Sequence, residues 1–422
     1  MNVTIERDVR LAIHGGEKVR QQPFPPRAPV GAEERAAVLA LLEQTVTSGA
    51  PLSYNGDEET GYCQEFAAWL GGGYADAVNS GTSALYVALQ ALQLEPFGEV
   101  IVSAITDPGG MMPIPLLNLI PVVADSEPDS YNSGPHQVAE LISPLTRAIV
   151  IAHIAGEPAN IAAIVEVARR HHLPVIEDCS QSHGARLAGK AVGAFGDIAI
   201  FSTMGGKHHH TGGQGGVVYT PDELFYQSIR RSSDRGKPFF LPAGATNDRA
   251  ALNLNLTDLS AAIGRVQLRK LPEIISRRQT IVGKLGEALD DLPTVSLPPL
   301  LPGAEACYWF LRLRFHAEQA ACDKATFCAA LMAEGLPIAP HYRAALPHTM
   351  DWFVNRRVFG TSGYPWTSPD YLGDRERAFP CPNAQQTMET HFNLYFHENW
   401  GEGEIADAIA IFQKVNTAYY RG

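Results

Sequence analysis

Two residues of this chain could together carry out chemistry on a carbonyl compound. Lys207 lies in a glycine-rich stretch that runs to Gly216, and Asp178 ends the apolar run that begins at Pro174. A lysine amine can hold the aldehyde of pyridoxal phosphate (PLP) as a Schiff base, and a carboxylate can keep the pyridine nitrogen protonated. The simpler alternatives are that Lys207 is a solvated loop lysine and that Asp178 only caps the following turn.

The segment Asn79-Ser-Gly-Thr-Ser-Ala-Leu85 lies where a predicted strand turns into a predicted helix. Gly81 permits close approach of the backbone, and Thr82 and Ser83 offer hydroxyls beside the free N–H groups of a helix N-terminus. This combination is typical of a phosphate-binding turn. The alternative is an ordinary Ser/Thr helix cap, which uses the same residue types.

Further polar residues accompany these two motifs. Gln181 follows Asp178 closely and could donate to a phenolic ring oxygen, and Ser202 could add a hydroxyl to the phosphate site. The run His208–His210 is not predicted to bind a metal, because adjacent residues do not point together in a regular element. We therefore predict no metal site.

Composition narrows the class of protein. Of 422 residues, 45% are hydrophobic and 18% charged, which is typical of an ordinary soluble globular protein. The net charge of −12 disfavours nucleic acid as a partner. Six scattered cysteines without a CxxC pair indicate a reducing compartment. No signal peptide is evident, and the apolar stretch 111–124 is too short and proline-rich to span a bilayer, so we expect a cytoplasmic protein with no membrane partner.

Strand and helix patterns alternate through the first two thirds of the chain. Near-continuous β-branched runs separated by amphipathic helices predict an α/β fold, a three-layer sandwich around a mostly parallel sheet. The strands are predicted at 74–79, 99–103, 120–124, 148–152, 174–177 and 197–202, and the helices at 33–46, 83–92, 161–172 and 259–275.

The two ends of the chain differ from this pattern. Residues 1–32 are rich in Gly and Pro and predict an extended arm, and residues 33–279 form the predicted large, PLP-binding domain. Beyond it, an alternating strand at 311–315 and helices at 326–334 and 405–420 predict a smaller α+β domain over residues 280–422.

Taken in order, these motifs resemble the DegT-like (DegT/DnrJ/StrS) sugar aminotransferases, PLP enzymes of the aspartate-aminotransferase fold type I. The resemblance runs from about residue 30 to the C-terminus. It rests on the 79–85 turn, the strand after Gly98, the Asp125 and Tyr131-Asn132 element, the 175–185 segment and the run 253–268.

The resemblance implies a role for each candidate residue. Lys207 would hold the cofactor and transfer the proton, Asp178 would pair with the pyridinium, and Gln181 would approach the ring oxygen. The residues implied in phosphate and ring binding are Gly81, Thr82, Ser83, Asp107 and Ser202. Asn253 would reach the active site of a neighbouring subunit, which makes a homodimer the catalytic unit. His341 and Tyr342 resemble a segment near the substrate.

The chain departs from the family pattern in three places. Asp107 stands where an aromatic residue usually stacks on the pyridine ring, and Asn255 replaces an arginine. The segments 359–366 and 397–400 do not match the common ending of sugar enzymes. The identity of the amino acceptor is therefore open.

The leading hypothesis is a PLP-dependent aminotransferase with ping-pong kinetics. It would move an amino group from glutamate or glutamine to a keto sugar, keto-cyclitol or related biosynthetic intermediate. One alternative is a pyridoxamine-phosphate-dependent sugar dehydratase of the same fold, in which the lysine position is often a histidine. Another is a catalytically silent regulatory or ligand-binding homologue, which the presence of Asp178, Gln181 and Lys207 disfavours.

Overall fold

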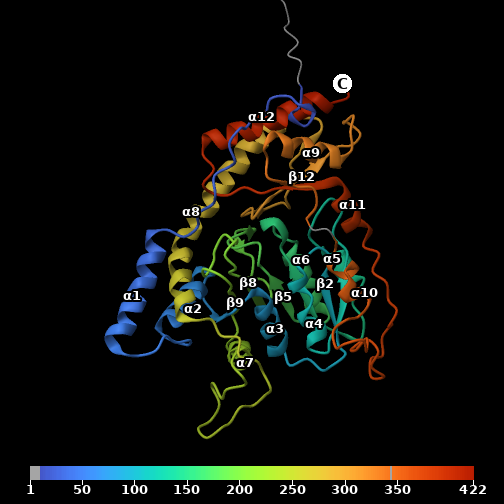
Figure 1. Cartoon of the computed structure of the whole chain (residues 1–422). Coiled ribbons are helices and arrows are strands. Elements are labelled where there is room, and N and C mark those ends of the chain that lie inside the picture. The colour runs from blue at the N-terminus through green and yellow to red at the C-terminus, as the bar shows by residue number, and fades with distance from the viewer. Residues whose placement is uncertain (1–9, 343–344) are drawn as a thin grey trace, which may run out of the picture.

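A computed structural model gives the fold and describes residues 10–342 and 345–422. A sheet of seven strands forms its centre (Figure 1), with bounds β1 Tyr74–Val78, β2 Glu99–Ser103, β3 Ile120–Ala124, β4 Thr146–Ala152, β5 Val175–Asp178, β8 Ile198–Ser202 and β9 Gly216–Thr220. Their order is β1-β9-β8-β5-β4-β2-β3. The β3, β2, β4, β5 and β8 strands pair in parallel, whereas β9 is antiparallel to both β8 and β1. The predicted, mostly parallel sheet is confirmed.

Helices cover both faces of this sheet. They are α2 Asp57–Trp69, α3 Gly81–Ala91, α4 Pro113–Leu116, α5 Pro135–Ala139, α6 Ile161–Arg170, α7 Glu223–Ser233 and α8 Asp258–Leu289. The helix α1 Ala32–Ser48 packs on α8 instead. Within β2, Val100 and Val102 pack in the core that contains α3, while Ile101 packs in the core that contains α5 and α6. Because successive strand residues point to opposite faces, each face needs its own apolar cover. The three-layer arrangement predicted from sequence is confirmed.

A second, smaller sheet lies beyond the large one. It is antiparallel, in the order β10-β12-β14-β13, with bounds β10 Val295–Ser296, β12 Leu311–Phe315, β13 Ile338–Ala339 and β14 His391–Leu394. Two helices, α9 Lys324–Glu334 and α12 Glu402–Tyr419, pack on it and bury residues such as Phe327 and Phe412. Figure 1 shows α9 and α12 together at one end of the molecule.

One long helix joins the two sheets. The sequence prediction ended it at Ile275, which is wrong, because α8 continues through Pro272 to Leu289. Its last turns are held by burial of Val282 and Leu285 in the core of the small sheet. The predicted boundary between residues 279 and 280 therefore falls inside a continuous helix, and the division into domains stays a prediction.

Several short elements complete the described chain. They are the three-stranded sheet β6 Arg186–Leu187, β7 Lys190–Ala191 and β11 Ala304–Glu305, the helices α10 Asp351–Val354 and α11 Pro382–Thr390, and the 3-10 turns η1 Ala12–His14, η2 Pro108–Gly110, η3 Ile154–Gly156 and η4 Pro347–Thr349. Apart from η1, residues 10–31 form no helix or strand, and residues 1–9 lie outside the described residues. The arm over residues 1–32 stays a prediction. Within the described ranges, no helix combines the length and apolarity needed to cross a bilayer.

Candidate active site

A cleft of about 290 Å³ opens at the carboxyl edge of the large sheet. Strands β1, β2, β4, β5 and β8 all end at this edge, and the residues at or just after their ends line the cleft, as in other open α/β sheets. The predicted site residues that line it are Gly81, Thr82, Asp107, Asp178, Gln181, Ser202 and Lys207. Folding thus brings into one cleft residues that are spread over more than a hundred positions of sequence.

Asp178 is the last residue of β5 and is 7% exposed. The backbone N–H of Ser180 donates to its Oδ1 at 3.0 Å, so the turn-capping role considered from sequence is also present. Burial raises the pKa of the Asp178 carboxyl, and nearby Lys207 acts in the opposite direction. A buried carboxylate of this kind is stabilised by a cationic partner, such as a protonated ring nitrogen.

Lys207 is also 7% exposed and its side chain enters the cleft. Its Nζ lies 3.6 Å from the centroid of the Trp309 ring, a cation–π contact. The Trp309 indole N–H in turn donates to the carbonyl of Gly206 at 3.0 Å. Trp309 lies between β11 and β12, so a residue beside the small sheet contacts the candidate lysine, which follows β8 of the large sheet.

The turn before α3 has the local geometry of an anion site. Ser80 is the N-cap, and its Oγ accepts from the N–H of Ser83 at 3.0 Å. The first intrahelical bond runs from Ala84 to Ser80, which leaves the N–H groups of Gly81 and Thr82 ahead of the ladder, where a helix N-terminus binds anions. The Ser83 hydroxyl donates to Asn79 at 2.7 Å, and Ser83 is outside the cleft lining.

Close packing explains the glycine in this turn. A Cβ on Gly81 would lie 2.6 Å from the Cβ of Ser202. Only glycine lets α3 begin this close to the end of β8, which places Thr82 and Ser202 on the same side of the cleft. The arrangement supports the predicted phosphate turn over an isolated helix cap.

Asp107, which stands where the family usually has an aromatic residue, lies in the segment after β2. Asp107 caps η2 by accepting from the N–H of Gly109 at 2.9 Å. Cβ atoms on Gly109 and Gly110 would lie 2.3 Å from Thr82 Oγ1 and 2.6 Å from Thr106 Oγ1. The backbone of this segment therefore packs directly against the wall of the cleft. Among the described lining residues, Trp309 supplies the only indole or phenyl ring.

Gln181 and Tyr342 form a second polar contact in the cleft. The Gln181 amide accepts from the N–H of Ala155 at 2.9 Å and donates to the Tyr342 hydroxyl at 2.7 Å. Tyr342 is 8% exposed and is not itself a lining residue, but it contacts Gln181, which is. His341 is exposed and lies 3.4 Å from Lys324 Nζ, outside the cleft lining.

Asn253 does not line the cleft of its own subunit. It is exposed, forms an isolated bridge with Asp234 and accepts a hydrogen bond from the Asn255 side chain at 2.6 Å. Asn255, which stands in place of the family's arginine, thus holds Asn253.

One group of metal-ligand types lies close together in the described residues: His153, Glu177 and Cys179. His153 Nδ1 accepts from the N–H of Ala159, and its Nε2 lies 3.1 Å from a Glu177 oxygen. Glu177 also accepts from three backbone N–H groups between Gly193 and Gly196. Both imidazole nitrogens and both carboxylate oxygens are therefore already used. His208–His210 does not form such a group with the other described residues.

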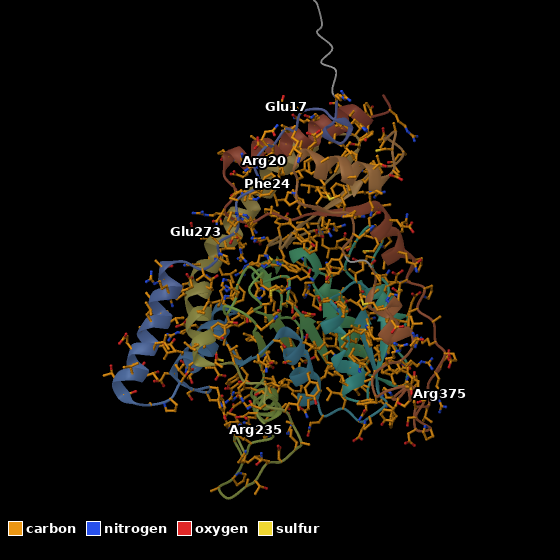
Figure 2. All side chains as sticks on the ribbon, in the orientation of Figure 1. Glu17, Arg20, Phe24, Arg235, Glu273 and Arg375 are labelled. Atoms are coloured by element: carbon orange, nitrogen blue, oxygen red, sulfur yellow. The ribbon has the colours of Figure 1, made fainter. Side chains whose placement is uncertain are left out.

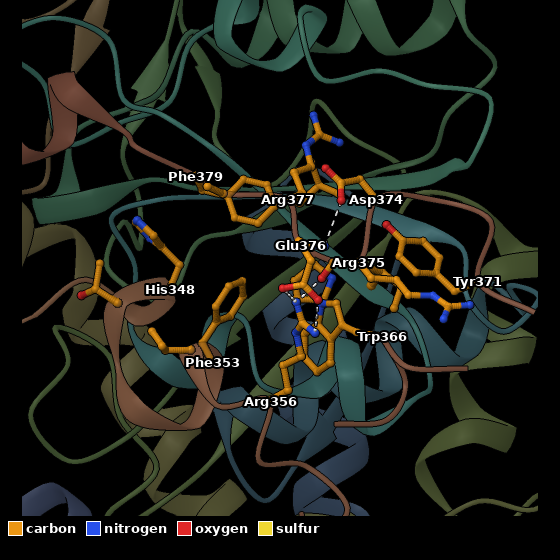
Figure 3. Close-up of a pocket in the computed structure, with 16 residues that line it drawn as sticks. His348, Phe353, Arg356, Trp366, Tyr371, Asp374, Arg375, Glu376, Arg377 and Phe379 are labelled. Carbon is orange, nitrogen blue, oxygen red and sulfur yellow. Dashed lines mark hydrogen bonds and ion pairs between the residues drawn. The ribbon is translucent and has the colours of Figure 1, made fainter. Parts of the chain in front are cut away.

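A second cavity, of about 390 Å³, lies beside the edge strand β3 (Figure 3). The connection between β13 and α11 builds most of its wall, including Trp366 and Phe379. Figure 3 shows Arg356 and Glu376 meeting there as an ion pair. None of the predicted site residues lines this cavity, so the cleft with Lys207 is the candidate active site.

Sequence reasoning missed several residues of the cleft. Thr106 and His153 follow the ends of β2 and β4, so the rule that ligands bind at the carboxyl ends of strands could have identified them. Met204 follows the end of β8 in the same way, whereas Gln214 and Trp309 carry no such signal.

Comparison with known proteins places the chain in a family. The family model for the DegT/DnrJ/EryC1/StrS aminotransferase family matches residues 32–367. An aminotransferase from Psychrobacter cryohalolentis is 25% identical, with a TM-score of 0.82 over 94% of this chain and 99% of the other. DesV of S. venezuelae, solved in complex with a ketimine intermediate, is 26% identical, with a TM-score of 0.77 over 94% and 99%. 3-Amino-5-hydroxybenzoic acid synthase is 27% identical, with a TM-score of 0.79 over 95% and 100%.

The mixed α/β architecture is therefore that of the aminotransferases. Because the family match spans most of the chain, the protein belongs to the DegT/DnrJ/EryC1/StrS aminotransferase family. The family, the fold class and the aminotransferase activity predicted from the sequence are confirmed.

Proposed function

We propose that the protein is a PLP-dependent aminotransferase whose cofactor binds in the cleft at the carboxyl edge of the sheet. The observation that carries the proposal is the meeting, in one cleft, of Lys207, the buried Asp178 and the N-terminus of α3. These are an amine, an acid and an anion-binding turn, which match the aldehyde, the ring nitrogen and the phosphate of PLP. When bound, PLP supplies an electron sink for breaking bonds next to the amino nitrogen.

Each residue has a definite part in this proposal. Lys207 would hold the cofactor through Nζ and later move a proton at that atom. Asp178 would keep a proton on the ring nitrogen, because its burial makes a cationic partner favourable. Thr82 and Ser202 would donate to the phosphate. Gln181 would orient the ring, since its own amide is fixed by Ala155 and Tyr342.

A spectroscopic titration tests this proposal. The wild-type protein supplied with PLP should show a visible absorption band, and that band should disappear when glutamate or glutamine is added. Lys207→Ala should show neither the band nor turnover. A wild-type protein that binds PLP without a visible band, or a band that neither donor changes, would sink the assignment.

The acceptor is proposed to be a keto sugar, a keto-cyclitol or a related biosynthetic intermediate. Family membership and the activities named for the similar structures support this class. A panel of such ketones, offered to the enzyme after glutamate has converted its cofactor, should contain compounds that restore the visible band. The rate of restoration ranks the acceptors directly.

We further propose that the catalytic unit is a homodimer in which Asn253 reaches the neighbouring cleft. Asn253 is exposed and away from its own cleft, and α1 carries exposed apolar residues, among them Leu39 and Val46. Exposed apolar helix faces are typical of interfaces. Mixing Lys207→Ala and Asn253→Ala subunits should regain part of the activity that each variant lacks, because the hybrid would contain one intact cleft. Equal inactivity of the mixture would exclude shared sites.

A further inference from the structure

The N-terminal arm is bound by the motif His397-Glu-Asn-Trp400, which departs from the family's usual ending. Residues of this motif contact Phe24, Pro25 and Arg27 of the arm. The Trp400 ring stacks on Phe24 with centroids 4.3 Å apart. His397 Nε2 donates to the carbonyl of Pro25 at 2.8 Å, and Asn399 donates to the carbonyl of Arg27 at 2.6 Å. Figure 2 labels Phe24 and Arg20 on the arm, where it passes the small sheet and α12. The motif therefore fixes the arm at Phe24–Arg27.

Glu398, the remaining member of the motif, binds two arginines. Its Oε1 accepts from Arg27 Nε at 2.8 Å, and its Oε2 accepts from Arg278 at 2.9 and 2.7 Å. Glu398 is 7% exposed and Arg278 2%, so these charges are held in a protected environment. Burial raises the pKa of Glu398, but the two guanidinium groups outweigh it and lower the pKa overall.

Each arginine holds the backbone of one residue that faces the cleft. Arg27 donates to the carbonyls of Lys207 and of His208, the latter at 2.9 Å. Arg278 donates to the carbonyls of Tyr308 and Trp309 at 2.9 and 3.1 Å. The Glu398 carboxylate is thus linked, through one arginine, to the backbone of Lys207. Through the other arginine it is linked to the backbone of Trp309, whose ring Lys207 contacts.

We propose that Glu398 is a positioning residue of the active site: through Arg27 and Arg278 it sets the placement of Lys207 relative to Trp309, which makes the arm segment Phe24–Arg27 a part of the catalytic apparatus. This inference rests on the proposed role of Lys207 in holding PLP. Two fixed guanidinium groups with one shared counter-charge also set the electrostatic field at the lysine loop. Asp178, His183 and His208 also interact electrostatically with Lys207, and burial lowers the pKa of both histidines.

The arm has separate anchors, so changing Arg27 need not detach it. Arg20 pairs with Glu404 and Asp407 of α12, and Glu334 accepts from the N–H groups of Ala12 and Val19. Arg20→Ala is therefore the matched control: it removes an arm arginine with two ion pairs and a contact to the Phe24 ring but, within the described residues, without a hydrogen bond to the lysine loop.

The test measures PLP capture by protein stripped of cofactor, and the pH at which the visible band of the loaded protein changes. Glu398→Gln and Arg27→Ala should each weaken capture about tenfold or more, and Arg20→Ala should leave it unchanged. Removing the negative charge should lower the pH midpoint and removing the positive charge should raise it, each by about half a unit. Arg27→Lys should keep the wild-type midpoint but not the capture, because an ammonium group cannot bind Glu398 and both carbonyls in a fork.

The outcomes separate this inference from the proposed function. Opposite shifts of the midpoint support positioning by the Glu398 network, since a general loss of structure would not produce opposite signs. Wild-type capture and midpoint in both Glu398→Gln and Arg27→Ala, or shifts in the same direction, overturn it while the aminotransferase proposal stands. A wild-type protein without a visible band overturns both.

Discussion

The contact between α3 and β8 gives the sharpest prediction about the proposed cofactor site. In Gly81→Ala, the new Cβ would lie 2.6 Å from the Cβ of Ser202, whereas ordinary contacts are 3.4–4 Å. The first turn of α3 must therefore move by about 1 Å away from Ser202, and overpacking of this size costs about 1–3 kcal/mol. Alanine is the better helix former by up to about 1 kcal/mol, which offsets part of that cost in the protein alone.

Binding of the phosphate would require the α3 turn and Ser202 to approach each other again. The cost should then appear in affinity, as a weakening of PLP binding by roughly 5- to 150-fold, because about 1.4 kcal/mol corresponds to a factor of ten. Equilibrium titration of the stripped protein with PLP, followed by visible absorbance, measures this. Unfolding in urea should show a loss of no more than about 2 kcal/mol.

Two further variants test whether steric contact with Ser202 causes the expected loss of PLP affinity. Gly283→Ala lies in α8 with no atom within 4 Å of its added Cβ, so PLP affinity should stay at the wild-type value. Combining Gly81→Ala with Ser202→Gly removes the closest clashing atom, and the pair should cost less than the sum of the two single changes. Wild-type affinity in Gly81→Ala, or strict additivity in the double variant, would refute the argument.

Other predictions concern buried acids. Burial raises the pKa of Glu59 to about 8. Its contribution to stability is therefore complete below about pH 4.5, the pKa in the unfolded chain, and is lost as the pH rises through 8. Glu59→Gln should be more stable than wild type in urea at pH 9, with no such gain at pH 4. Glu177→Gln should lower the free energy of unfolding by about 2–4 kcal/mol, because one of the two oxygens that accept buried N–H groups becomes an NH2 donor. The exposed Glu166→Gln should change it by less than about 0.5 kcal/mol in the same urea titration. Asp178→Asn should retain the visible band with PLP but react with glutamate roughly a hundredfold or more slowly in stopped-flow absorbance; an unchanged rate would contradict its proposed role.

The sequence located those parts of the fold whose signals are local. Runs of β-branched residues identified β2, β3, β4 and β8, because a strand buried on both faces needs apolar residues at every position. The amphipathic period identified α1 and α6, and glycines beside hydroxyl residues identified the turn at Gly81. Helices α2 and α7 and strand β9 escaped prediction, since their short apolar patterns fit other structures equally well.

Other features depend on residues that are distant in sequence. The end of α8 could not be placed at Leu289 from local propensity, because burial of its last turns needs a small sheet built from residues after 295. Ser83 is a better phosphate candidate in the sequence than in the structure for a local reason, because Asn79, four residues earlier, already accepts from its hydroxyl.

The sequence by itself determined the reactive groups and the family: Lys207, Asp178 and the turn at Gly81 are recognisable by residue type and order. Only the tertiary structure decided what surrounds them. It placed Trp309 against Lys207, packed the backbone after Asp107 closely against Thr82 and Thr106, and joined the arm to the lysine loop through Glu398 and Arg27. The physical reason is that local propensity acts over a few residues, whereas packing and charge pairing act between whichever residues folding brings within a few ångströms.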